Sequence, residues 1–94
     1  MANIVVQANH SNDVTYNFKV DVIEGDTQTS HKVELGRDDY QNITDGKVAP
    51  EELIQCSFEF LLEREPKESI LTSFNVSIIS RYFPEYEREI INYF

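Results

Sequence analysis

The sequence predicts an α+β fold, in which an N-terminal three-stranded antiparallel meander packs against two or three C-terminal helices. Apolar and polar residues alternate in the first third of the chain, and a period of two is typical of strands with one buried face. After Gly36 the apolar spacing becomes that of helices. The chain is 94 residues long and 40% hydrophobic, so we expect one domain over residues 1–94 with a modest core.

Three strands are expected in order along the N-terminal third. A weak strand covers residues 4–8, a clear one covers 15–22, and a third covers 31–35. The segment EGDTQ at 24–28 is typical of a turn, and the polar segment NHSND at 9–13 forms a loop. Short connections of this kind join antiparallel neighbours, which favours a meander.

Two helices are expected after the strands. The segment RDDYQNI at 37–43 predicts a short helical turn capped by Asp38. A longer helix begins at Pro50, because proline suits the first helical position. Its N-cap falls on Ala49, which has no side-chain acceptor for the first backbone N–H groups.

The long helix is expected to end near Arg64, because Pro66 cannot continue it and disfavours helical angles in the residue before it. Arg64 lies on the apolar side of this helix, so its guanidinium should reach water or pair with a carboxylate. A further helical turn is expected at 66–71. The candidate carboxylates are Glu34, Glu65 and Glu68.

The last third predicts two more helical segments. Asn75 is expected to cap a helix at 76–83, which stops at Pro84, and an amphipathic segment follows at 84–94. This tail is rich in aromatic residues, which either pack in the core or form a homodimer or partner interface, since Tyr and Phe are enriched in interface cores. Its large side chains are Tyr82, Phe83, Tyr86, Ile90, Tyr93 and Phe94.

The charge balance restricts the classes of partner. The chain has 17 acidic and 8 basic residues and a formal charge of -9. Direct binding to nucleic acid or to an anionic membrane is disfavoured, because both need clustered Lys and Arg. The sequence has neither a signal-peptide pattern nor a long apolar run. We therefore expect a cytoplasmic protein that does not bind membranes.

We expect no enzyme activity, no cofactor and no metal site. Glycine-rich phosphate loops and the common metal and nucleophile motifs are absent from the sequence. The one cysteine, Cys56, permits neither a disulfide framework nor a thiolate zinc cluster, and we expect it to be a buried, inert thiol. Of the two histidines, His31 falls on the inward face of its strand and is expected in the core.

The segments SFEFLLEREPKESIL and FNVSIISRYFPEYEREI resemble a family of small uncharacterised bacterial proteins. The resemblance covers roughly residues 45–91 and includes the charged proline corner and the YFPEYE-type segment. It implies a bacterial origin and a small α+β domain, and it carries over no functional residue. At the helix start such proteins would be expected to have Ser or Thr, where this chain has Ala49.

The function that the sequence favours is a small protein-interaction or regulatory module, which binds a protein partner or itself. Two alternatives remain open. One is an acidic decoy that imitates nucleic acid and occupies a DNA-handling protein through Glu52, Glu59 and Glu63. The other is a small-molecule-binding domain with a pocket between sheet and helices. The expected partner surface comprises Arg64, Lys67, Glu68, Tyr82, Tyr86 and Tyr93.

Overall fold

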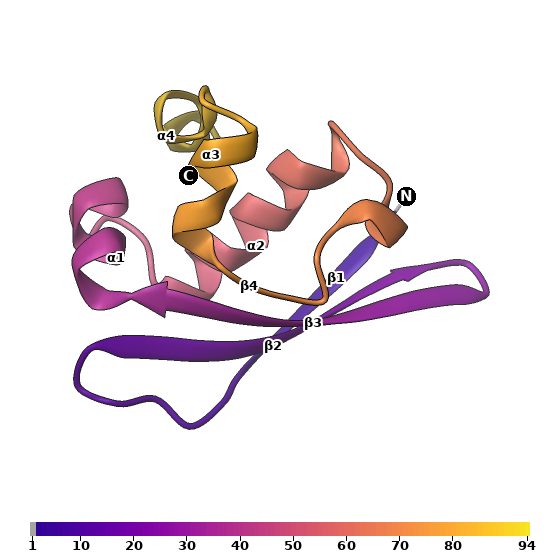
Figure 1. Ribbon diagram of the computed structural model, residues 1–94, viewed down its shortest axis with the longest axis horizontal. Helices are drawn as coiled ribbons and strands as arrows, with labels where there is room; N and C mark the ends of the chain where they lie inside the picture. Colours follow the sequence, from indigo (N-terminus) through magenta and orange to yellow (C-terminus); the bar gives the residue numbers. More distant parts are fainter. Residues whose placement is uncertain (1) are drawn as a thin grey trace.

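The computed structural model describes residues 2–94 and has an α+β fold, with the helices on one face of a four-stranded sheet (Figure 1). This confirms the predicted fold class. Within the described part of the chain, no helix is both long and apolar enough to cross a membrane. The strands are β1 (Asn3–Ala8), β2 (Thr15–Glu24), β3 (Thr27–Gly36) and β4 (Ser73–Asn75). The α-helices are α1 (Arg37–Thr44), α2 (Pro50–Leu62), α3 (Ile79–Tyr82) and α4 (Tyr86–Glu89), and the 3-10 turns are η1 (Lys67–Ser69), η2 (Val76–Ile78) and η3 (Ile90–Tyr93).

The sheet has the order β1-β2-β3-β4, with the first three strands antiparallel as predicted. A two-residue turn joins β2 to β3, and Gly25 has a φ of 56° there. Such hairpin turns require a left-handed residue, which glycine adopts without steric cost. The fourth strand was not predicted. It is three residues long and pairs in parallel with β3, so that Phe74 lies opposite Val33.

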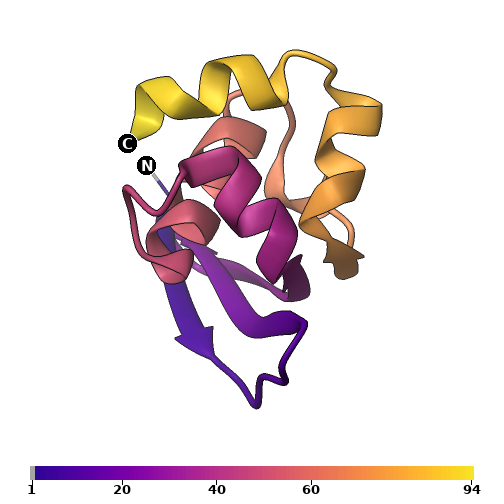
Figure 2. The same cartoon turned by 90° about the vertical axis from the view of Figure 1, so that its left-hand side faces the viewer.

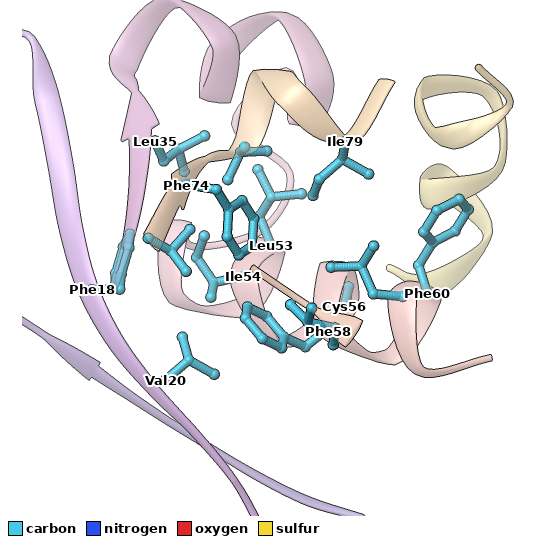
Figure 3. Packing of buried hydrophobic residues seen from close by; sticks show 14 of the residues in the cluster. Phe18, Val20, Leu35, Leu53, Ile54, Cys56, Phe58, Phe60, Phe74 and Ile79 are labelled. Atoms are coloured by element: carbon cyan, nitrogen blue, oxygen red, sulfur yellow. The ribbon is translucent and has the colours of Figure 1, made fainter. Parts of the chain in front are cut away.

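The register places the apolar residues of the strands on the face that the helices cover. Val20 on β2 lies opposite Val6 on β1 and His31 on β3. These side chains meet α2, whose apolar residues fill the layer above the sheet (Figure 3). The buried apolar residues are Phe18, Val20, Val22, Val33, Leu35, Leu53, Ile54, Cys56, Phe58, Phe60, Leu61, Ile70, Phe74, Val76, Ile79, Tyr86 and Ile90.

The central helix, α2, contacts a different layer on each side. Phe58 packs against His31 and Phe74, on the sheet side. Phe60 packs against aromatic rings of the C-terminal segment instead, and it lies apart from the other labelled residues (Figure 3). The C-terminal segment lies at the opposite end of the molecule from the strands (Figure 2). The wide apolar arc of α2 is therefore covered from two sides, as its width indicates.

The starts of the helices confirm one predicted cap and correct another. Ala49 is the N-cap of α2 and makes no side-chain cap hydrogen bond, as predicted. The predicted cap of α1, Asp38, is wrong. Because β3 continues through Gly36, that residue becomes the N-cap and Asp38 falls inside the first turn.

The last third follows the predicted order of segments but is broken into shorter pieces. Asn75 caps as predicted, since its Oδ1 accepts a hydrogen bond from the Ser77 N–H at 3.0 Å. The segment 76–83 forms η2 and then α3, and the final segment forms α4 and η3. Within the aromatic tail, Tyr86 and Ile90 lie in the core.

Candidate docking groove at the proline corner

Arg64, one of the residues expected to meet a partner, is instead held by the C-terminal segment of its own chain. Its Nε donates to Glu85 Oε2 at 3.1 Å and its Nη2 donates to Glu89 Oε1 at 2.9 Å. Its guanidinium carbon lies 3.6 Å from the ring centroid of Phe60, in cation–π contact. Pairing with a carboxylate was predicted, but Glu34, Glu65 and Glu68 were the wrong candidates. Because the chain reverses after α3, α4 passes the end of α2, and the partners come from its N-cap residue Glu85 and its last residue Glu89.

Lys67 is also engaged within the chain. Only 4% of the residue is exposed, and its Nζ lies 3.1 Å from Glu24 Oε1 and 2.6 Å from Glu68 Oε2. It therefore ties the end of β2 to η1. The hydrogen bond from Lys67 is the main reason why the pKa of Glu68 lies below its usual value.

The three tyrosines of the expected partner surface lie in different environments. Tyr86 is fully buried, so in this conformation it cannot contact a partner, and its place on that surface is corrected. Tyr93 is partly buried and donates its hydroxyl hydrogen bond to Glu63. Tyr82, by contrast, is 65% exposed. The structure thus leaves Tyr82 and Glu68 as the exposed members of the set.

Tyr82 borders an apolar groove with a volume of about 390 Å³. The end of α2, the turn η1 and the α3 segment form its walls. Eight of its ten lining residues are aliphatic or aromatic, a composition typical of binding sites. The lining residues are Leu61, Glu65, Ser69, Ile70, Leu71, Phe74, Ile78, Ile79, Tyr82 and Phe83.

The rim of the groove exposes large apolar side chains. Leu71 is 46% exposed and Tyr82 is 65% exposed. Exposed apolar residues are common singly on proteins, but here two of them border the same apolar groove.

A buried histidine fixes the position of Leu71. His31 is 1% exposed, and its Nδ1 lies 2.7 Å from the carbonyl oxygen of Leu71. Because a carbonyl only accepts, Nδ1 carries the proton, and Nε2 is 2.8 Å from the Thr29 hydroxyl. His31 is therefore a satisfied core histidine, as predicted, and it holds one wall of the groove.

Within residues 2–94, Glu65 is the one charged residue that lines the groove. Burial raises the pKa of its carboxyl above the ordinary value of 4.5. Among residues 2–94, no ion pair or side-chain hydrogen bond engages this carboxyl. The groove therefore combines an apolar lining with one incompletely hydrated acid.

A second hollow, of about 450 Å³, differs in character because its lining is polar. Two of the lining residues, Lys19 and Lys32, lie directly opposite each other on β2 and β3. Asp21 and Glu34 alternate with them on the same open face of the sheet. The charges of these four residues cancel, so the face has no net preference for an anion.

The sequence interpretation missed the groove, because its lining residues are scattered between positions 61 and 83. No helical or strand period relates Glu65 to Leu71 or Tyr82. Only the reversal of the chain at the proline corner brings them together.

The part of the chain that the structure describes contains no group of three or more His, Cys, Asp or Glu side chains that could hold a metal ion. Comparison with protein-family models, curated proteins and solved structures finds no match for this chain.

Proposed function

We propose that this protein is an interaction module that binds an amphipathic segment of another protein in the groove beside the proline corner. The partner segment carries apolar side chains and one Lys or Arg that reaches Glu65. The observation that supports this proposal is the Glu65 carboxyl, which has a raised pKa and no ion-pair partner within residues 2–94, inside a mainly apolar groove.

The apolar lining supplies the affinity. A docked segment would cover the exposed parts of Leu71 and Tyr82, and each Å² of apolar surface removed from water is worth roughly 25 cal/mol. Tyrosine is well suited to this position, because it offers a large contact area at a small cost in side-chain entropy.

Glu65 supplies the specificity. A cation from the partner would meet a carboxylate that has lost part of its hydration, where ion pairs are stronger than in water. A segment with an acidic or neutral residue at that point would bury the carboxylate without a partner, which is unfavourable. The net charge of -9 also steers basic segments towards the protein.

We assign no reaction to the groove. A carboxyl with a raised pKa can act as a general acid, but catalysis needs further groups that converge on the same point. Among the residues that the structure describes, no other carboxylate and no histidine, cysteine or lysine lines the groove.

Selection from a displayed library of short helical peptides tests the proposal. The library would fix apolar residues at positions i, i+3 and i+7 and vary the remainder, with counter-selection on Leu71→Asp. We expect the selected peptides to carry Lys or Arg. Calorimetry should then show that Glu65→Gln weakens them about five- to tenfold, because a partly buried ion pair is lost.

The matched control is Ile91→Asp, which changes an exposed apolar residue outside the groove. This variant should bind the selected peptides as the wild type does. Peptides that lack a cation, or that bind Leu71→Asp as tightly as the wild type, would overturn the proposal.

A further inference from the structure

The free edge of β1 points to a second interaction surface, and we infer that two copies of this chain associate there. The two β1 strands pair in an antiparallel arrangement, so that two four-stranded sheets become one continuous sheet. This inference uses a different surface from the groove and does not depend on the proposed function.

The backbone of β1 has unused hydrogen-bonding capacity. In residues 2–94, β1 pairs only with β2 and lies at one edge of the sheet. Pairing runs without interruption from Asn3 opposite Ile23 to Ala8 opposite Phe18, so no bulge deforms the strand. Its outward N–H and C=O groups therefore form a regular template for a further strand.

The two edges of the sheet differ in their protection. Proteins commonly block edge strands by charge, proline, bulges or short length. β4 at one edge is only three residues long and leads directly into η2. β1 at the other edge has six residues, NIVVQA, with no charge and no proline. Of the two edges, only β1 is long enough for extended pairing. Once two copies have paired through β1, this edge is used in both of them, so the assembly stops at a dimer.

The absence of charge on β1 makes this strand a more favourable place for a second copy to bind than the charged regions of the surface. Two chains that each carry a charge of -9 repel one another. A strand without charged residues lets the backbones approach with the least repulsion, and acidic residues elsewhere are screened within about 8 Å at physiological salt.

Side chains on β1 are suited to the same arrangement. Ile4 and Val6 lie on the helix-covered face but stay partly exposed, and Val5 is partly exposed on the open face. A two-fold axis beside Val5 sets Ile4 of one copy opposite Val6 of the second. Directly opposite residues of antiparallel strands lie on the same face of the sheet. The partly exposed side chains of Ile4 and Val6 would therefore cover each other across the interface.

Sedimentation analysis across micromolar to millimolar concentrations tests this inference. We expect the wild-type chain to form dimers, and Val5→Lys to dissociate about tenfold or more readily, because two like charges then face each other. The matched control is Gln28→Lys, which adds the same charge at an exposed position on β3. It should associate as the wild type does.

Hydrogen exchange of the wild-type chain gives a second readout that does not depend on a variant. In a monomer, only the β1 amides that face β2 are protected, so protection alternates along the strand. In the dimer, the outward amides gain protection, and this gain rises with protein concentration. A monomer at every concentration with alternating protection, or a dimer that Val5→Lys leaves intact, would overturn the inference.

Discussion

The hydroxyl groups of Ser57 and Tyr86 lie 2.7 Å apart in the core and join α2 to the C-terminal segment. Ser57 Oγ also donates to the carbonyl oxygen of Leu53 at 2.7 Å. Since its one hydrogen is used there, Ser57 accepts from Tyr86. Burial raises the pKa of Tyr86, so its hydroxyl keeps its proton and remains the donor.

This direction of donation predicts a rescue between two variants. Ser57→Ala leaves the buried Tyr86 hydroxyl without a partner and should cost about 1–3 kcal/mol. Tyr86→Phe leaves Ser57 bonded to Leu53 and should cost only about 0.5–1.5 kcal/mol. The double variant should therefore be more stable than Ser57→Ala alone, measured by urea unfolding. Simple additivity of the two losses would contradict the assignment.

Arg64→Ala should lower the free energy of unfolding by about 2 kcal/mol, because it removes two ion pairs and a cation–π contact. Arg88→Ala is the matched control. The Arg88 side chain is 78% exposed and its nearest carboxylate oxygen, on Glu89, is 3.7 Å away, so the loss should stay within about 0.5 kcal/mol. Equal effects in denaturant titrations would show that the Arg64 contacts add no stability.

Ala49→Ser should raise the free energy of unfolding by about 0.5–1 kcal/mol, because serine can accept a hydrogen bond from the first turn of α2. The backbone of Ala49 is already extended, with φ of -67° and ψ of 155°, which suits a capping serine. Thermal unfolding measures the gain. The same change at the exposed strand residue Ala8 should give no comparable increase.

Cys56 should resist alkylation in the folded protein. Burial raises the pKa of its thiol to about 11, with smaller contributions from Glu59 and Glu52. Compared with the ordinary value of 9.0, this reduces the thiolate fraction near neutral pH by about a hundredfold. Iodoacetamide labelling followed by mass spectrometry should be slow in buffer and complete in denaturant. Rapid labelling in buffer would show that the thiol is accessible.

Glu65→Gln should change how stability depends on pH. Burial raises the pKa of Glu65 in the folded state above 4.5, so ionisation of this group disfavours folding. Well below pH 4.5 the carboxyl is protonated in both states, and wild type and variant should behave alike. As pH rises through the raised pKa, the variant should become relatively more stable. A melting-temperature difference that does not vary with pH would contradict the raised pKa.

The strands and the core histidine could be predicted because their signals are local. Alternation around Phe18 and Val20 defines an inward face, and His31 falls on it by the same period of two. Proline effects are equally local, so the start of α2 at Pro50 and its end before Pro66 were predictable.

The remaining features depend on contacts that are distant in sequence. β4 is too short for an alternating pattern, and only its place beside β3 makes it a strand. Because Arg64 lies on the apolar side of its helix, the sequence indicated that it needs a carboxylate partner. The sequence could not show that this partner is Glu85, because the direction of the chain after α3 places Glu85 beside Arg64. The groove around Glu65 likewise exists only in the folded chain.

The parallel pairing of β4 with β3 has a consequence for synthesis of the protein. The ribosome finishes β3 at Gly36, but its parallel neighbour begins only at Ser73. At cellular rates of elongation this interval is on the order of a few seconds. Throughout it, the outer edge of β3 has no strand to pair with, and the chain can complete its sheet only after Phe74 has been added.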